Sequence, residues 1–153
     1  MEKIASFTVN HDILPKGLFI SRSDADIITY DLRMRLPNCG DYLSNSAIHT
    51  IEHLFATYVR NTAFSNEIIY VGPMGCRTGF YFLTRNTLTG EQVIKLLKET
   101  FTFIADYDDV IPGTAHKECG NCLEHDLFSA KKEAADYLKV IADYSMEMLN
   151  YPT

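Results

Sequence analysis

The 153-residue sequence lacks several features that define large classes of protein. No apolar run approaches the roughly 20 residues that cross a membrane, and the first residues include no apolar stretch of signal-peptide length. There is no excess of basic residues, because 14 lysines and arginines face 20 aspartates and glutamates, for a net charge of −6. Nucleic-acid binding requires basic surface that displaces counterions from phosphates. We therefore expect a cytoplasmic protein without nucleic-acid or membrane partners.

Signals for nucleotide cofactors and for disulfide scaffolds are also missing. The sequence has no phosphate-binding loop of the G-x-G-x-x-G or P-loop kind, so nothing indicates a nicotinamide or flavin. Four cysteines in a chain of this size do not suggest a disulfide framework; in a reducing compartment they are free thiols, metal ligands or catalytic groups. No repeat or linker divides residues 1–153, which we interpret as a single domain.

The spacing of apolar residues predicts an α+β fold in which an antiparallel sheet packs against helices. Strand patterns occur at residues 4–9, 18–20, 28–36, 67–71 and 80–83. Residues 28–36 alternate apolar and polar side chains, which is typical of a half-buried antiparallel strand. Helix patterns occur at residues 47–60 behind Ser46 or a neighbouring N-cap, after the Thr89–Gln92 capping box, and at residues 127–149. Residues 106–124 indicate a loop.

The strongest chemical signal is His49-Thr50-Ile51-Glu52-His53. On a helix, His49 and His53 share one face, and two imidazoles at this spacing can bind one metal ion. Glu52 would then lie beside the metal as a proton-transfer group. The pattern H-x-x-E-H occurs in metallopeptidases. The alternative to a metal site is a polar helix face on which the two histidines are solvated and have no chemical role.

A catalytic metal site needs a third protein ligand and keeps one position open. Cys119 and Cys122 are the best candidates. Their C-x-x-C spacing is compatible with a redox dithiol, with half of a structural zinc site, or with one metal-binding thiolate beside a bystander, and we favour the last. His116 and His125 lie nearby in the sequence, and such loop histidines are more often solvated or cap a helix.

Cys76 is the other singular residue, because glycines at positions 75 and 79 flank it. An exposed thiol at such a turn can take and return a proton. A lone cysteine is more commonly a small buried turn residue. The spacing alone does not decide between these two interpretations.

Short segments spread along the chain carry a joint signal. They are Ser6-Phe7, His11, Asp31-Leu32-Arg33, Pro37-Asn38, His49-Thr50-Ile51-Glu52-His53-Leu54, Pro73-Met74-Gly75-Cys76-x-Thr78-Gly79, Cys119-Gly120 and His125-Asp126-Leu127. In this order they resemble the S-ribosylhomocysteine lyase (LuxS) family over nearly the whole chain. The resemblance implies an α+β homodimer with two active sites at the subunit interface.

The resemblance also implies a role for each residue of the metal site. His49, His53 and Cys119 would be the metal ligands, and Glu52 and Cys76 the acid/base pair. The expected ion is Fe²⁺, one per subunit, with Zn²⁺ or Co²⁺ able to take its place. Two imidazoles and a thiolate suit all three ions, so ligand spacing does not choose among them.

The implied substrate is S-ribosyl-L-homocysteine, which Arg33 would contact and which Ser6 and His11 would reach from the partner subunit. The implied products are L-homocysteine, which belongs to the methyl cycle, and 4,5-dihydroxy-2,3-pentanedione, the precursor of a quorum-sensing autoinducer. The thioether on C5 of the ribose has no acidic neighbour, so it is a poor leaving group. The carbonyl must first migrate from C1 to C3, and only then can β-elimination release the thiolate.

Two other functions are compatible with parts of the sequence. In an H-x-x-E-H metallopeptidase, Glu52 would activate a metal-bound water, but Cys119 and Cys76 would have no role. In a non-catalytic binding module stabilised by a metal, Cys122 would complete a closed site of four protein ligands.

Overall fold

The computed structural model covers all 153 residues and has the expected α+β composition in one domain. The strands are β1 (Gly17–Asp24), β2 (Ile27–Arg33), β3 (Ile68–Pro73) and β4 (Gly79–Arg85). The helices are α1 (Asn45–Val59), α2 (Gly90–Asp106) and α3 (Leu127–Ile141), with short 3-10 helices η1 (Ala5–Phe7), η2 (Ser65–Glu67) and η3 (Met146–Leu149). None of these helices combines the length and the apolar character that crossing a bilayer demands.

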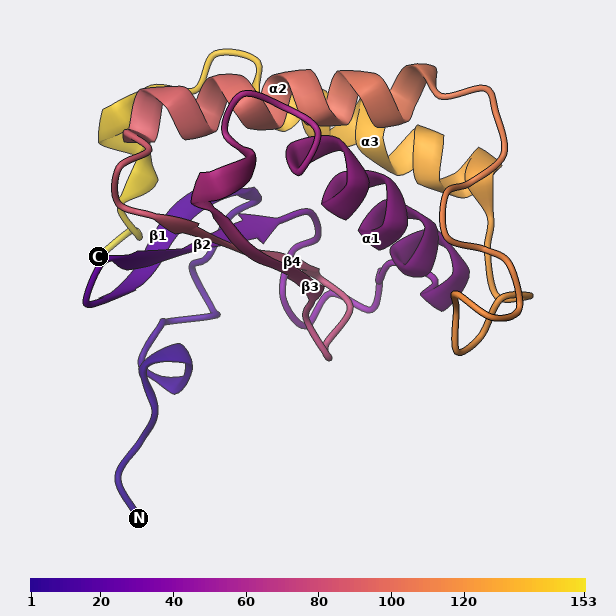
Figure 1. The fold of residues 1–153 in the computed structure, drawn as a ribbon. Helices are drawn as coiled ribbons and strands as arrows, with labels where there is room; N and C mark the ends of the chain where they lie inside the picture. The colour runs from indigo at the N-terminus through magenta and orange to yellow at the C-terminus, as the bar shows by residue number, and fades with distance from the viewer.

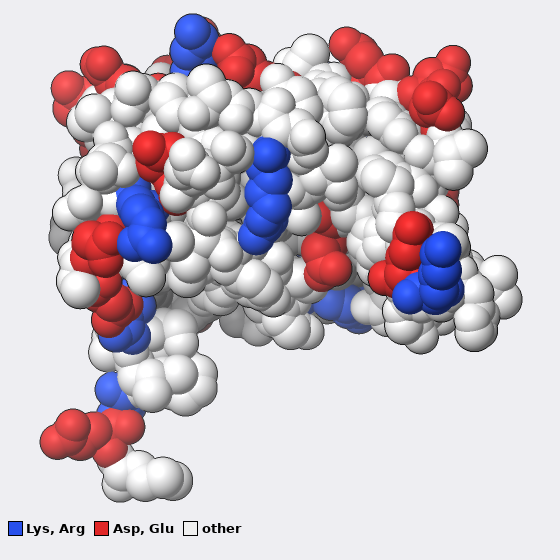
Figure 2. Space-filling model, viewed as in Figure 1, with Lys and Arg blue, Asp and Glu red and all other residues white.

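The four strands form one antiparallel sheet in the order β1-β2-β4-β3. All three long helices lie on one face of this sheet, and the N-terminal segment extends away from the opposite face (Figure 1). On the face of the molecule shown in Figure 2, basic side chains are interspersed with acidic and uncharged ones.

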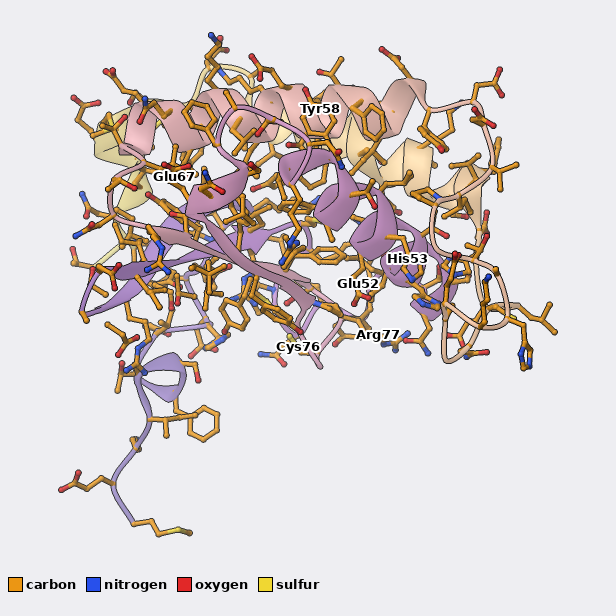
Figure 3. All side chains as sticks on the ribbon, in the orientation of Figure 1. Glu52, His53, Tyr58, Glu67, Cys76 and Arg77 are labelled. Carbon is orange, nitrogen blue, oxygen red and sulfur yellow. The ribbon has the colours of Figure 1, made fainter.

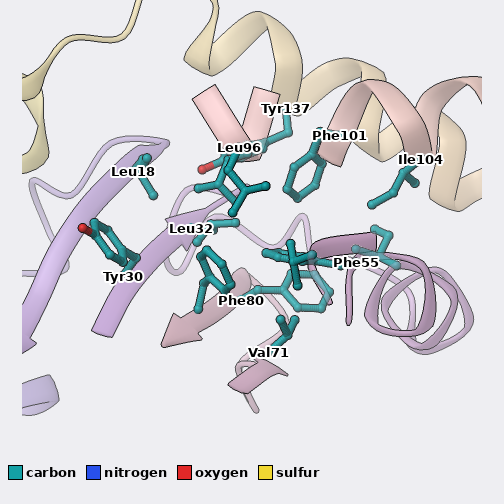
Figure 4. Close-up of a cluster of buried hydrophobic side chains, with 14 of the residues drawn as sticks. Leu18, Tyr30, Leu32, Phe55, Val71, Phe80, Leu96, Phe101, Ile104 and Tyr137 are labelled. Atoms are coloured by element: carbon teal, nitrogen blue, oxygen red, sulfur yellow. The ribbon is translucent and has the colours of Figure 1, made fainter. Parts of the chain in front are cut away.

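The hydrophobic core fills the space between the sheet and the helices (Figure 4). Its aromatic centre includes Phe55 of α1, whose ring lies 5.2 Å from that of Phe82 and 5.5 Å from that of Phe101. Burial of each large apolar side chain contributes about 1.5–3 kcal/mol to folding. The fully buried large side chains of the core are Tyr30, Tyr137, Phe55, Phe80, Phe82, Phe101, Leu18, Leu32, Leu43, Ile51, Leu54 and Leu88.

The helix starts follow local capping chemistry. The predicted capping box is confirmed, since the Thr89 hydroxyl accepts from the Gln92 amide and the Gln92 side chain accepts from the Thr89 amide. Helix α1 begins slightly earlier than predicted, because Ser44 rather than Ser46 caps it by accepting a hydrogen bond from Ala47.

Two elements are shorter than their patterns predict. Strand β2 ends at Arg33 instead of residue 36, because the amides of Met34 and Arg35 both bond to the single carbonyl of Thr78 and the regular ladder stops. Helix α3 ends at Ile141 instead of residue 149. The chain turns there so that the Tyr144 hydroxyl bonds to both the amide and the carbonyl of Leu18 in β1.

The prediction of a strand at residues 4–9 is wrong. This segment contains the 3-10 helix η1, and no strand of the chain pairs with it. Its apolar side chains Ile4 and Phe7 are exposed to solvent. A β-forming pattern becomes a strand only where another strand edge satisfies its backbone groups.

The turn between β3 and β4 is held tightly against β2. Gly79 lies opposite Arg33 in the β2–β4 pair, and a Cβ atom at Gly79 would lie 1.8 Å from the carbonyl oxygen of Leu32. Only a residue without a side chain allows this approach. The close approach brings the segment Cys76–Thr78 beside the end of β2.

We expect Gly79→Ala to destabilise the protein, because the added Cβ must push two strands apart. Overpacking of this kind costs about 1–3 kcal/mol, or about 2–12 °C in melting temperature for a chain of this size. Thermal unfolding of Gly79→Ala and Gly75→Ala measures the effect, since a Cβ at Gly75 meets no atom within 4 Å. An equal loss of stability in both variants would contradict this account.

Candidate functional site

Helix α1 presents His49 and His53 on one face, as their four-residue spacing predicts. Their ring centroids lie 4.7 Å apart, with the rings nearly perpendicular at 83°. The opposite face of α1 packs into the core through residues that include Ile51 and Phe55. Core packing of one face therefore fixes the position of the histidines on the other.

Backbone carbonyls determine which nitrogen of each histidine carries the proton. His49 Nδ1 lies 2.8 Å from the carbonyl oxygen of Glu124, and His53 Nδ1 lies 2.8 Å from that of Pro112. A carbonyl oxygen only accepts, so each Nδ1 carries the hydrogen and each Nε2 keeps its lone pair. This is the tautomer that binds a metal through Nε2, with the second nitrogen oriented by the protein.

Cys119 supplies a third donor at the same point. Its Sγ lies 3.4 Å from His49 Nε2 and 3.9 Å from His53 Nε2. Two imidazole nitrogens and one sulfur are a ligand set that suits zinc and related divalent ions and leaves one position open. The residues present thus fit a metal ion, and the three predicted ligands come together although Cys119 lies 70 residues after His49 in the sequence.

His125 belongs to the same cluster, which the sequence interpretation missed. The donor atoms of His49, His53, Cys119 and His125 all lie within 4.8 Å of one another. His125 directly precedes Asp126, the N-cap of α3, so the start of α3 brings the ring to the other three donors. The signal available in the sequence was its place six residues after Cys119.

The orientation of His125 differs from that of the two α1 histidines. Its ring stacks on His49, with centroids 3.9 Å apart and planes 24° from parallel. An imidazole binds a metal in the plane of its ring, and the planes of two closely stacked rings do not meet near both Nε2 atoms. His125 is therefore not aligned to bind the same ion as His49.

The hydrogen bonds of His125 also indicate that this ring does not bind the same ion as His49. The Thr50 hydroxyl accepts from the amide of Asp126 and lies 3.0 Å from His125 Nδ1, to which it can donate its own proton. The hydrogen of a neutral His125 is then on Nε2, 3.9 Å from the sulfur of Cys119. Burial, with the neighbouring His49 and His53, lowers the pKa of His125 to about 4, so the ring is neutral at pH 7.

Two proton-transfer candidates lie beyond the metal-binding cluster. Glu52 of α1 is half-buried, and Cys76 is an exposed thiol in the turn between β3 and β4. Figure 3 shows both side chains at the lower side of the molecule in that view. The exposure of Cys76 favours the reactive-thiol interpretation over the buried turn residue. The next residue, Arg77, has a positive φ of 60°, a conformation that is uncommon for non-glycine residues.

The predicted substrate-binding residues lie on the side of the sheet opposite α1, α2 and α3. Arg33 is only 3% exposed, and its guanidinium donates to both oxygens of Asp31 and to the Thr78 hydroxyl. Ser6 lines a hollow of about 340 Å³ that Tyr70 and Tyr81 also border. His11 is partly buried, and its Nδ1 lies 2.9 Å from the carbonyl oxygen of Val9.

The remaining cysteines and His116 do not join the donor cluster. Cys122 is partly buried, and its sulfur is not among the grouped donor atoms. The positions of the donor atoms therefore favour Cys119 over Cys122 as the thiolate of the site. Cys39 is exposed and donates to the carbonyl of Pro37, and His116 is exposed as predicted.

Comparison with known proteins gives a consistent result. A sequence model of the family described as S-ribosylhomocysteinase (LuxS) matches residues 4–147. A protein from Phocaeicola vulgatus named S-ribosylhomocysteine lyase is 46% identical over 159 aligned positions, which cover 100% of this chain and 99% of that protein. A protein of the same name from Porphyromonas gingivalis is 45% identical, and the alignment covers 99% of each chain. Another from Borreliella afzelii is 43% identical, and the alignment covers 99% of this chain and 100% of that protein. The chain belongs to the LuxS family.

Proposed function

We propose that this chain is a metal-dependent carbon–sulfur lyase that cleaves S-ribosyl-L-homocysteine to L-homocysteine and 4,5-dihydroxy-2,3-pentanedione. The observation that carries the proposal is the convergence of His49, His53 and Cys119 in a chain of the LuxS family. The names of its relatives support the substrate. A cytoplasmic location is part of the proposal, since it keeps the four cysteines reduced.

In this proposal His49, His53 and Cys119 hold one ion per subunit. Fe²⁺ is the proposed ion, and the same donors accept Zn²⁺ or Co²⁺. When bound, such an ion is a Lewis acid that polarises a carbonyl oxygen and makes the neighbouring C–H group acidic. His125, stacked on His49, orients that ring and leaves the fourth position to the substrate.

Cys76 performs the proton transfers that move the carbonyl. With the ribose ring open, its thiolate takes the proton from C2 and returns one to C1, while the hydroxyl at C2 becomes the ketone. The same exchange between C3 and C2 then gives the 3-ketone. A single group that takes and returns protons suffices for both steps, and the exposed sulfur of Cys76 has free access to a substrate.

Glu52 performs the elimination. In the 3-ketone the C4 proton is α to the carbonyl, and the sulfur on C5 is β to it. Glu52 takes the C4 proton, the electron pair forms the C4–C5 double bond, and the C5–S bond breaks to release homocysteine thiolate. The resulting enol gains a proton at C5 and loses one from the C4 hydroxyl, which gives the dione. Glu52 also carries protons between the substrate oxygens.

The proposed active unit is a homodimer in which Ser6 and His11 of the partner complete each site. The N-terminal segment that carries Ser6 extends from the sheet and exposes Ile4 and Phe7 (Figure 1). Exposed apolar side chains on a projecting segment are well suited to burial against a second copy. Arg33 is proposed to contact the substrate from the same side of the sheet.

The direct test is an assay for free thiol. Metal-loaded protein incubated with S-ribosyl-L-homocysteine should release one homocysteine for each dione formed. A metal-loaded, folded dimer that releases no thiol would refute the proposal. Cleavage of peptides without thiol release would instead support the metallopeptidase alternative.

The ligand assignment predicts a joint loss of metal and activity. His49→Ala, His53→Ala and Cys119→Ala should each lose the ion, because two remaining donors do not hold it. Cys122→Ala is the matched control and should keep both metal and activity. Metal content per subunit after gel filtration, with thiol release on the same samples, measures this. If Cys122→Ala loses the metal while Cys119→Ala keeps it, the assignment is wrong.

The acid/base assignment predicts variants that bind metal but do not turn over. Cys76→Ala and Glu52→Gln should keep the fold and the ion and lose about 10²–10⁴-fold in turnover. In D₂O, Cys76→Ala should incorporate no deuterium at C2, whereas Glu52→Gln should accumulate a ketone. Proton NMR of the substrate follows both outcomes. Near-normal turnover in Cys76→Ala would remove the thiol from the mechanism.

The shared site predicts complementation between inactive subunits. A heterodimer of His11→Ala and Cys76→Ala chains has one site with both defects and one site with neither. Mixing the two proteins under conditions of subunit exchange should therefore restore part of the wild-type activity. A fully active monomer, or no recovery despite proven exchange, would rule out shared sites.

A further inference from the structure

A continuous series of hydrogen bonds on the face of the sheet opposite the three long helices ends at Cys76. The Cys76 sulfur lies 3.0 Å from the Thr78 hydroxyl oxygen, which accepts a 2.7 Å hydrogen bond from Arg33 Nη1. Because the oxygen already accepts from a guanidinium, its own proton can point to the Cys76 sulfur, which lies nearer than its other acceptor, the Met74 sulfur at 3.9 Å. The positive charge of Arg33 thus polarises the Thr78 hydroxyl toward Cys76.

The other end of the series is in the C-terminal tail. The Tyr151 hydroxyl donates to Asp31 Oδ2 at 2.6 Å, and this same oxygen accepts from Arg33 Nη2 at 2.7 Å. Burial, reinforced by the Asp31 carboxylate, raises the pKa of Tyr151, so its hydroxyl keeps the proton that it donates. The Tyr151 ring stacks on Phe19 at 5.0 Å between centroids, which fixes it against the sheet.

We propose that Tyr151 and Thr78 are positioning residues that keep Cys76 reactive. Tyr151 weakens the hold of Asp31 on Arg33, and Thr78 transmits the effect of the Arg33 charge to the sulfur. The inference rests on the proposed role of Cys76 in proton transfer. Asp31 and Arg33 are 1% and 3% exposed, so water does not screen their interaction. The Tyr151 hydroxyl neutralises part of the Asp31 charge, so Arg33 polarises the Thr78 hydroxyl more strongly.

This arrangement predicts that loss of the Tyr151 hydroxyl makes Cys76 less reactive. Without the Tyr151 hydroxyl, Asp31 keeps its full negative charge and attracts Arg33 more strongly. Arg33 then polarises the Thr78 hydroxyl toward the Cys76 sulfur less strongly. Tyr151→Phe should slow every reaction of the Cys76 thiolate without removing the ring stacked on Phe19.

The test measures the alkylation of Cys76 by iodoacetamide in the metal-loaded protein between pH 6 and 9, followed on the Cys76 peptide by mass spectrometry. We expect Tyr151→Phe to react about three- to tenfold more slowly at pH 7, as the loss of one charge-assisted hydrogen bond implies. Thr78→Val should be slower still, and Thr78→Ser should recover near wild-type rates. Tyr58→Phe, on α1 against Phe103, is the matched control and should react as wild type does.

The double variant separates this role from general destabilisation. If Tyr151 acts through Thr78, then Tyr151→Phe combined with Thr78→Val is no slower than Thr78→Val alone. Effects that multiply, or a Tyr151→Phe profile that coincides with the wild-type profile, would overturn the inference. Should Tyr151→Phe not fold, wild-type rates in Thr78→Val would overturn it equally. Thiol release from the unmodified protein is scored separately, because its failure would refute the proposed function and leave the alkylation result standing.

Discussion

The carbonyl groups of Pro112 and Glu124 accept hydrogen bonds from the two histidines of α1, and the donor arrangement of the site depends on these two bonds. They place a proton on each Nδ1 and leave both Nε2 lone pairs for a metal. They also hold the segment between α2 and α3, which has no regular structure, against α1. A bound ion would reinforce the same connection through Cys119, so metal binding and the ordering of this segment are coupled.

The rest of the fold supplies rigidity to this arrangement. One face of α1 is fixed in an aromatic core around Phe55, so the opposite face, with His49, Glu52 and His53, has little freedom to move. The start of α3 then adds His125 behind His49. On the other side of the sheet, Gly79 allows the turn that carries Cys76 to approach β2. Two distant parts of the sequence, one for the metal and one for the thiol, are thus positioned on one scaffold.

The sequence predicted those features that depend on local spacing. The pair His49 and His53 follows from the helical repeat, and the start of α2 follows from its capping box. The spacing of Cys119 and Cys122 did not decide which of the two thiols lies beside the histidines. That depends on how the chain folds over the 70 residues between His49 and Cys119. The resemblance to a family supplied the choice of Cys119, and the positions of the donor atoms agree with it.

The features that the sequence did not predict depend on tertiary contacts. The alternation in β2 indicated a half-buried strand with a polar face, yet Asp31 and Arg33 on that face are buried. Asp31 accepts from Tyr151 of the tail, and Arg33 donates to Asp31 and Thr78. The helical pattern after Ile141 is interrupted because Tyr144 bonds to β1. The ring of His125 meets the cluster only through the packing of α3 beside α1. The contacts of Tyr144 and Tyr151 have no signature in the spacing of neighbouring residues, and that of His125 has only its nearness to Cys119 in the sequence.

The central claim is that the site has three protein ligands and one open position. X-ray absorption spectroscopy of the zinc-loaded protein tests it most directly, because the spectrum distinguishes sulfur from imidazole ligands. The account predicts one sulfur at about 2.3 Å, two imidazole nitrogens and one further light atom from solvent or substrate. The His125→Gln protein should give the same count of imidazoles. A second sulfur, or a third imidazole that disappears in His125→Gln, would contradict the account.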